Sequence, residues 1–413
     1  MVAPYPWGMS FDFDALRRHP DVEGPGLEAS DAADRLILDE AAALIGEAGP
    51  GEIAVIDDSY GALALAAAEA GARGIRVHQD LVTGERALAE NAGRLGFDDE
   101  VSSLALRPEL VSGARLVLMR LPRSLDRLDE VSQLIAAHAD PEVVIVAGGR
   151  IKHMSLAMND VLRRSLGRVD VSRARQKSRV LIAREPRRSS SDEGAYRDQT
   201  AESRYGAGAP TRPAEGASTR LTGPGWPRST RHDDLGLTVV AHGGVFAGTG
   251  VDIGTRFLLA QLGDAVPDAA TAVDLACGTG VVASWLARAR PALRVTATDR
   301  SASAAASARL TAEANGVSDR VHVTRADGLE ALADASERLI VLNPPFHSDA
   351  AISTGIAGHL FADAARVLAP GGELWCVWNS HLAYRPLLER VVGRTRQIAR
   401  NPKFTVTASR RAG

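Results

Sequence analysis

Short apolar runs alternate with longer amphipathic stretches in two parts of this chain. In the first part such runs lie at residues 53–56, 75–78, 103–106, 116–119 and 143–146. They are rich in Ile, Val and Leu, which is typical of strands buried on both faces of a sheet. Residues 31–48 carry apolar side chains at helical spacing. Strands that alternate with helices of this length indicate βαβ units and a parallel sheet.

The second part repeats the alternation and adds signals for the ends of a helix. Its apolar runs lie at residues 271–275, 293–297, 321–324, 339–342 and 373–378. Ser301 is a suitable N-cap for the helix after the second run, and Asn315-Gly316 is a suitable stop. The sequence therefore predicts a second α/β domain of the same Rossmann-like kind.

The segment between the two parts has a different composition. From Pro186 to Leu235 there is no Ile, Val, Met or Phe, whereas Ser, Arg, Gly and Pro are frequent. Such a segment cannot bury enough apolar surface to offset the entropy that ordering would cost. We therefore expect a disordered linker or insertion at 186–235, which contributes nothing to a core, between a first domain at 1–185 and a second at 236–413.

Matching intervals indicate that the two domains arose by duplication. The interval from Gly61 to Asp80 equals the interval from Gly280 to Asp299. An equal interval between a glycine-rich turn and the acidic end of the next strand predicts two copies of one fold.

The residues that carry chemistry differ between the two copies. Gly278-Thr279-Gly280 corresponds to Ser59-Tyr60-Gly61, and Asn343, in a strand that ends at proline, corresponds to Arg120. The sequence therefore predicts that only the second copy holds a cofactor and that the first is degenerate.

Composition and charge narrow the class of protein. Hydrophobic residues make up 45% and charged residues 24% of the 413, which is globular composition for two domains. Cys277 and Cys376 are too few for a disulfide framework or a zinc site, so we expect a reducing cytoplasm. We find no signal peptide and no apolar run that approaches a membrane span. The net charge of −3 argues against a uniformly basic surface but allows local basic patches.

The stretch 274–283 reads as a strand, a glycine-rich turn and the start of a helix. Gly278 and Gly280 let the backbone approach a ligand closely, and the helix start supplies N–H groups. Asp299 closes the next strand, where a carboxylate can accept hydrogen bonds from ribose hydroxyls. The pattern Gly278-x-Gly280-x-x-Ala283 also fits a dinucleotide site. It indicates a nucleoside ligand without identifying which one.

Two further features favour a sulfonium cofactor over a dinucleotide. Asp274 lies just before the glycines, where a carboxylate suits a cationic ligand and would repel a pyrophosphate. Asn343-Pro344-Pro345-Phe346 ends the fourth strand, at the edge where open α/β sheets bind ligands. Asp327 is placed to take an adenine amino group, although an ordinary Asp-Gly turn explains it equally well.

These motifs resemble those of class I S-adenosylmethionine-dependent methyltransferases that act on exocyclic amines. More narrowly, the chain resembles the bacterial ribosomal RNA guanine-N2 methyltransferases, whose members include small subunit methyltransferase C and large subunit methyltransferase G. The matching stretches are 244–254, 274–280 and 343–347, with 57–63 and 173–179 closer to the large-subunit enzyme. The resemblance implies two tandem methyltransferase domains, the first without a cofactor.

The resemblance also implies a set of site residues. For S-adenosyl-L-methionine they are Asp252, Asp274, Ala276, Gly278, Gly280, Asp299, Asp327 and Asn343, and for catalysis they are Asn343, Pro344, Pro345 and Phe346. The Asn343 side-chain oxygen and the Pro344 carbonyl would hold the target amine, and Phe346 would stack on a flipped base. Asp252 would order the entrance loop or cap the following helix. No metal is needed.

Two basic stretches are consistent with RNA as the substrate. Residues 163–188 hold ten Lys and Arg against two acidic residues, and 384–413 hold eight against one. We expect ribosomal RNA or a ribosomal subunit as the partner of a monomer. Three alternatives remain open: methylation of adenine N6 or protein glutamine, nicotinamide-dependent hydride transfer, and a catalytically silent ribosome-assembly factor.

Overall fold

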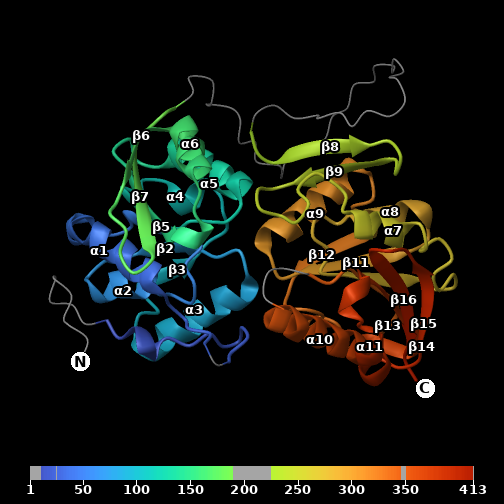
Figure 1. Ribbon diagram of the computed structural model, residues 1–413. Coiled ribbons are helices and arrows are strands. Elements are labelled where there is room, and N and C mark those ends of the chain that lie inside the picture. Colours follow the sequence, from blue (N-terminus) through green and yellow to red (C-terminus); the bar gives the residue numbers. More distant parts are fainter. Residues whose placement is uncertain (1–10, 25, 189–224, 346–349, 413) are drawn as a thin grey trace, which may run out of the picture. The chain divides into compact units, whose positions relative to one another are not determined.

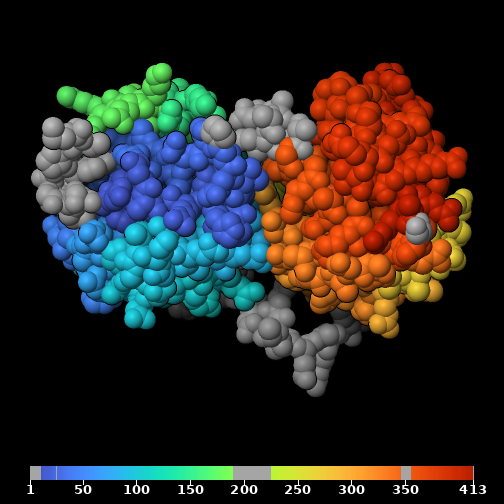
Figure 2. Space-filling view, turned by 90° about the horizontal axis from the view of Figure 1, so that it is seen from below, coloured from blue at the N-terminus to red at the C-terminus, as the bar shows by residue number. Residues whose placement is uncertain are grey.

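Two compact units make up the chain. The computed structural model describes residues 11–24, 26–188, 225–345 and 350–412. Unit 1 is Met1–Glu215 and unit 2 is Gly216–Gly413, coloured blue to green and yellow to red in Figure 1. In the space-filling view each colour range keeps to its own unit (Figure 2).

Unit 1 is a seven-stranded sheet with helices on its faces. The strand order is β3-β2-β1-β4-β5-β7-β6. Strands β1 to β5 are parallel, and β7 runs antiparallel to both β5 and β6. The strands are β1 (Ile53–Ile56), β2 (Ile75–His78), β3 (Val101–Ser103), β4 (Leu116–Arg120), β5 (Val144–Arg150), β6 (Leu166–Val171) and β7 (Ser178–Pro186). The helices are α1 (Ala32–Glu47), α2 (Ala64–Glu69), α3 (Val82–Leu95), α4 (Pro108–Val111), α5 (Leu125–His138) and α6 (Leu156–Ser165).

Unit 2 repeats this sheet and adds a two-stranded ribbon. The order is β12-β11-β10-β13-β14-β16-β15, and β8 pairs with β9 separately. The strands are β8 (Arg228–His232), β9 (Leu237–Ala241), β10 (Thr271–Leu275), β11 (Arg294–Asp299), β12 (Val321–Arg325), β13 (Glu337–Leu342), β14 (Leu368–Asn379), β15 (Thr395–Arg400) and β16 (Phe404–Arg410). The helices are α7 (Ile253–Leu259), α8 (Val281–Ala289), α9 (Ala302–Ala314), α10 (Ala350–Val367) and α11 (Arg385–Val391).

The identical strand order confirms the predicted duplication and the tandem α/β fold. In unit 2 the chain runs outward from β10 to β12 and returns as β13 on the other side of β10. The carboxyl ends of β10 and β13 therefore flank the topological switch point, where such sheets bind ligands. The antiparallel hairpins β6–β7 and β15–β16 were not predicted, because part of each is polar and exposed. Strand β3 ends at Ser103, whereas the apolar pattern predicted a strand at 103–106.

The predicted helix ends are confirmed by their hydrogen bonds. Asp31 caps α1 in a capping box with Asp34. Ser301 caps α9, where its Oγ accepts from the Ala304 N–H at 3.1 Å. The helix stops at Asn315, followed by Gly316 with φ 65°.

The start of unit 2 corrects the predicted linker boundary. Residues 225–235, assigned above to the linker, contain β8, which pairs antiparallel with β9. The outer edge of β9 is in turn covered by polar side chains of α9, which lies beside it in Figure 1. Thr311 Oγ1 accepts from the Val240 N–H at 3.0 Å, and Asn315 Oδ1 accepts from the Thr238 N–H at 2.9 Å. Pairing with β9 therefore orders β8, a strand of only polar residues (Arg228–His232). Residues 189–224 lie outside the described residues.

Candidate functional site

The loop after β10 has the shape of a ligand cradle. Ala276, Gly278 and Gly280 all have left-handed backbone, with φ of 56°, 54° and 71°. A Cβ added to Gly280 would lie 2.8 Å from the Ala308 Cβ, so this glycine lets α9 pack against the loop. A Cβ added to Gly278 would meet no atom within 4 Å. Gly278 therefore faces open space, and it is the glycine that leaves room for a ligand.

Asp299 holds this loop from the end of β11. Its Oδ2 accepts from the Gly278 N–H at 2.9 Å, and its Oδ1 accepts from the Ser301 N–H at 2.9 Å. A carboxylate has about four acceptor sites, so these bonds leave capacity for a ligand hydroxyl. The ribose contact stays a prediction, and the structure adds a loop-shaping role.

Asp274 is buried near the end of β10, beneath the glycine-rich loop. Its side chain is 3% exposed, and its Oδ2 accepts from the Ala283 N–H of α8 at 2.9 Å. Burial raises the pKa of this carboxyl to about 7, assisted by the charge of Asp299. The hydrogen bond to the Ala283 N–H fastens α8 beneath the loop. The place of Asp274 beside a cationic ligand stays a prediction.

Three side chains meet at the carboxyl end of β13, one that follows the strand and two from the start of α7. Asn343 Nδ2 donates to Thr255 Oγ1 at 3.0 Å and to Asp252 Oδ2 at 3.5 Å. Asp252 is the N-cap of α7, and the same Oδ2 accepts from the Gly254 and Thr255 N–H groups at 2.8 and 3.2 Å. Of the two roles expected for Asp252, capping is the one found. Its second contact here is with Asn343.

This arrangement fixes which way the Asn343 amide points. An ionised carboxylate only accepts hydrogen bonds, so the nitrogen must face Asp252 and the oxygen must face away. That oxygen, Oδ1, is buried and has no hydrogen-bond partner among the described residues. A buried acceptor without a partner carries a free-energy cost of about 1–3 kcal/mol, and such atoms mark functional positions. The arrangement suits a ligand that brings its own N–H.

Thr255 is a site residue that sequence reasoning missed. It is 9% exposed and lies three residues after the helix cap Asp252. The spacing Asp-x-x-Thr is a signal for a polar side chain in the first turn of a helix. Nothing in the sequence shows that this turn meets β13, because the contact joins residues 88 positions apart.

The remaining predicted residues are placed less completely. Pro344 is buried and Pro345 is half-buried directly after Asn343. Phe346, predicted to stack on a base, lies outside the described residues, as does His347. Asp327 follows β12, and its carboxylate lies 3.7 Å from His359 Nε2, with Gly328 at φ 59° completing a turn. Its contact with adenine stays a prediction.

Unit 1 contains a charged counterpart of the Asn343 cluster. Arg120 ends β4 as Asn343 follows β13, and its guanidinium donates to Asp34 at 2.9 Å and to Asp31 at 3.2 Å. Asp31 caps α1 as Asp252 caps α7, with Asp34 in the same helical position as Thr255. The unit 1 cluster keeps the same positions at the helix cap and the strand end but has no amide oxygen in place of Asn343 Oδ1.

Strand register corrects one detail of the predicted duplication. Ile56 pairs with His78 in unit 1, and Leu275 pairs with Thr298 in unit 2. His78 of β2 therefore corresponds to Thr298 of β11, and the residues after them are Gln79 and Asp299. Asp80, which the sequence comparison matched with Asp299, lies one residue further on. The counterpart of Asp299 is an uncharged amide.

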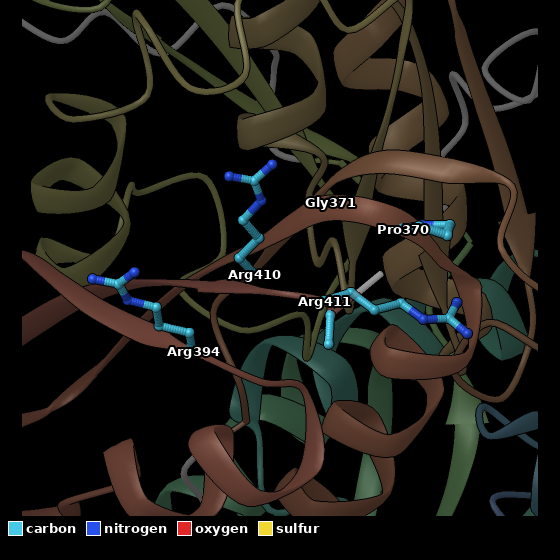
Figure 3. A pocket seen from close by; sticks show the side chains of 6 residues that line it. Pro370, Gly371, Arg394, Arg410 and Arg411 are labelled. Carbon is cyan, nitrogen blue, oxygen red and sulfur yellow. The ribbon is translucent and has the colours of Figure 1, made fainter.

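A second cavity in unit 2 lies at the other end of the sheet. It has a volume of about 450 Å³, is lined by residues including Arg394, Arg410 and Arg411, and adjoins the start of β14. Figure 3 shows their guanidinium groups pointing in different directions. Arg411 Nη1 also donates to the Arg366 carbonyl at 2.9 Å. The positive charges that line this cavity therefore do not converge on a common position.

Two absences concern only the described part of the chain. It contains no group of three or more His, Cys, Asp and Glu side chains that could hold a metal ion. None of its helices combines the length and the apolar character needed to cross a membrane.

Family models match both units. The model described as Methyltransferase small domain matches residues 236–408, which contain the whole cluster around Asn343. The model described as RLMG N-terminal domain matches residues 8–187.

Full-length relatives and a solved structure agree with these matches. The chain is 33% identical over 407 residues to ribosomal RNA large subunit methyltransferase G of Streptomyces avermitilis, covering 97% of each chain. It is 34% identical over 395 residues to the protein of that name from Pseudomonas aeruginosa, covering 95% of this chain and 96% of the relative. The Thermus thermophilus 16S rRNA N2 G1207 methyltransferase, in complex with AdoMet and guanosine, superimposes with a TM-score of 0.65 at 21% identity. It covers 94% of this chain and 97% of its own, which confirms the tandem fold.

Proposed function

This chain belongs to the ribosomal RNA large subunit methyltransferase G family, and from that membership we propose that it methylates the exocyclic N2 amine of a guanine in ribosomal RNA. It is an S-adenosylmethionine-dependent rRNA methyltransferase, with unit 2 as the catalytic unit. The similarity of unit 2 to an enzyme described as acting on N2 of a guanine supports the choice of acceptor.

One observation carries the proposal: the buried Oδ1 of Asn343 has no partner within the described residues. An exocyclic amine has two hydrogens, and its lone pair is delocalised into the ring. The Asn343 Oδ1 accepts one hydrogen, and the carbonyl of the next residue, Pro344, accepts the other. Both acceptors gain strength as the nitrogen becomes positive, so they stabilise the transition state more than the bound substrate.

The residues around the Gly278 loop fit the cofactor. Gly278 faces open space, Asp299 shapes the loop with acceptor capacity to spare, and α8 begins directly after Gly280. S-adenosyl-L-methionine, when bound, supplies an electrophilic methyl group on a sulfonium centre. The protein's share is orientation: Thr255 and Asp252 hold the Asn343 amide so that its oxygen faces the acceptor amine.

The proposal also fixes the setting in which the chain works. A substrate within ribosomal RNA places the protein in the cytoplasm, acting as a monomer on naked large-subunit rRNA or on a subunit. The exposed basic residues of unit 1 support RNA binding there.

Methyl transfer from labelled S-adenosylmethionine tests the proposal. The acceptors would be deproteinised rRNA of each subunit and the assembled subunits, digested to nucleosides after reaction. We expect label in N2-methylguanosine from the large-subunit rRNA.

Other results would replace the proposal with one of the alternatives. Label in N6-methyladenosine or in protein glutamine would change the acceptor. Absence of transfer to every RNA and particle, from protein that binds the cofactor in calorimetry, would favour a silent assembly factor.

A further inference from the structure

Unit 1 has a cavity at the place where unit 2 has its catalytic residues. It measures about 350 Å³ and lies at the carboxyl ends of β4 and β5. Arg120, the counterpart of Asn343, lines it, together with segments 148–150 and 152–154. The degenerate copy has therefore kept a hollow at its switch point.

Cations dominate the lining of this cavity. Arg120, Arg123, Arg150 and Lys152 line it, against the single carboxylate of Asp31. Arg120 is offset by the buried carboxyl of Asp34 at 2.9 Å, and Arg150 lies 4.0 Å from Asp31. Arg123 and Lys152 remain, both exposed, with no acidic partner in the described parts of the chain.

The His153 side chain lies beside these cations, and its pKa reflects their positive charge. Arg123 Nη2 donates to His153 Nε2 at 3.2 Å, which requires a neutral imidazole. Partial burial lowers the pKa of His153, and repulsion by Arg123, Lys152 and Arg150 lowers it further. An anion in the cavity would reverse the effect of these charges.

The positive surface continues beyond the cavity along the β6–β7 turn. This turn, residues 172–177, lies at the same sheet edge because Arg150 pairs with Ser178. The Ile151 N–H donates to the Lys177 carbonyl at 2.9 Å, which attaches the turn to the cavity wall. Arg173 and Lys177 are exposed and have no acidic partner within the described residues. A cavity that continues into a line of cations suits a chain of phosphates better than a single small anion.

We propose that this cavity binds a backbone phosphate of the RNA substrate. The β6–β7 turn then contacts neighbouring phosphates of the same RNA strand on one side of the cavity. The degenerate copy thus lost its cofactor site but kept the cavity, which now carries positive charges that bind the substrate. These charges belong to Arg120, Arg123, Arg150 and Lys152. The inference rests on the RNA substrate of the proposed function. It adds a phosphate site in unit 1 that is separate from the catalytic cluster.

A charge-removal pair tests the site. Arg123→Gln/Lys152→Gln removes the two cations without acidic partners. The control Arg73→Gln/Arg115→Gln removes two charges at the opposite ends of the strands, just before β2 and just before β4. We expect the Arg123→Gln/Lys152→Gln variant to bind a large-subunit rRNA transcript about tenfold more weakly than the wild type at low salt. The slope of log affinity against log salt should fall by about one to two. The rate at saturating RNA should be unchanged, and the control pair should match the wild type.

The His153 ring signals provide a second readout that needs no RNA or enzyme activity. Titration with inorganic phosphate should raise the pKa of His153 in the full chain, and Lys152→Gln should weaken the response. A single-stranded RNA oligonucleotide should produce the same change and compete with phosphate. A response to phosphate that RNA does not reproduce would mean a small-anion site and would overturn the RNA assignment.

The two proposals fail in distinguishable ways. If the cavity pair binds RNA as the control pair does, or phosphate leaves His153 unchanged, the phosphate site is wrong whatever the enzyme methylates. If no N2-methylguanosine forms but both binding readouts respond as expected, the acceptor is wrong and the phosphate site stands.

Discussion

A single amide orientation decides what the site around Asn343 can bind. The Asp252 carboxylate and the Thr255 hydroxyl take the amide nitrogen, so a buried oxygen without a partner is left to face the substrate. In unit 1 the same positions hold Arg120, Asp31 and Asp34, and the Arg120 guanidinium donates to both carboxylates. The exchanges of Asn343 for Arg120 and of Thr255 for Asp34 thus separate a site with a buried acceptor that lacks a partner within the described residues from a charged cluster without such an acceptor.

Asn343→Ala should reduce the chemical step far more than it reduces binding. The lost acceptor strengthens in the transition state, and removal of one such preorganised group costs about 10²–10³ in rate. Affinity for S-adenosylmethionine should stay close to wild type, since the Gly278 loop is intact. Single-turnover methylation at saturating RNA measures this. A rate near that of the wild type would show that the Asn-Pro-Pro turn only ends the strand and has no catalytic role.

Thr255→Val and Thr255→Ser separate orientation from packing. Valine keeps the shape but removes the acceptor for Asn343 Nδ2, leaving only the 3.5 Å contact with Asp252. Loss of one hydrogen bond, at about 0.5–1.5 kcal/mol, should slow methyl transfer about 3- to 10-fold. Serine keeps the hydroxyl and should retain most of the rate, with KM for RNA unchanged in both. Equal rates for the two variants would contradict the positioning role.

Asp274→Asn should flatten the pH dependence of stability in unit 2. The pKa of this carboxyl is about 7 in the folded chain and about 4 when unfolded, so the folded state keeps a proton that the unfolded state loses. Stability therefore falls as the pH rises from about 4 to 7, by at most about 1.4 kcal/mol per pH unit, and levels off above 7. Four of the five tryptophans lie in unit 2, so denaturation followed by tryptophan fluorescence reports on it. An identical slope in the variant would show that Asp274 does not titrate in this range.

At the scale of elements, the ribbon β8–β9 shows how a polar segment becomes ordered. Its strand β8 has few apolar residues, but Ser229 and His232 are buried against β9, and His232 Nε2 is 2.8 Å from the Thr249 carbonyl. The other edge of β9 is closed by side chains of α9. Leu237 and Val239 of β9 pack in the core of unit 2, and pairing with β9 holds the polar strand β8.

Replacing segments on either side of the β8 boundary should have opposite results. Residues 189–224 exchanged for a Gly-Ser sequence of equal length should leave the melting temperature of unit 2 unchanged, since they have no core residues to contribute. Extending the exchange to residue 233 removes β8 and should lower that temperature by several degrees. If the shorter exchange already has this effect, the segment packs on a unit. If the longer exchange has none, β8 is dispensable.

At the scale of the whole molecule, one fold occurs twice with one active copy. The loops after β1 and β10 share a left-handed residue, Asp57 with φ 57° and Ala276 with φ 56°. In unit 1, however, Ser59 replaces the open glycine Gly278, and the hydroxyl of the next residue, Tyr60, donates to Asp21 at 2.6 Å. The N-terminal segment of the chain thus contacts the degenerate loop.

Calorimetry should therefore find one S-adenosylmethionine site per chain. Asp299→Ala removes the carboxylate that shapes the Gly278 loop and should abolish measurable binding. The matched change Gln79→Ala, at the corresponding position of unit 1, should leave the stoichiometry at one. Binding of two cofactors per wild-type chain would contradict the assignment of unit 1 as degenerate.

The sequence by itself determined the tandem fold, the glycine loop and the family resemblance. Apolar periodicity is set locally, because buried parallel strands need continuous Ile, Val and Leu such as Leu339–Leu342. Turn chemistry is local too, so Ser301 and Asn315 could be assigned as helix ends from their neighbours alone. Both kinds of signal lie within about 15 residues of the position they specify.

Only the tertiary structure decided which partners the polar residues take. The burial of Asp274, the contact of Asn343 with Thr255 and the closure of β9 by α9 all join segments that the chain order separates. The same holds for the cations around the unit 1 cavity, which come from the ends of two different strands. Hydrogen bonds and charges act over a few ångströms in space, and a sequence records residue type but not that proximity.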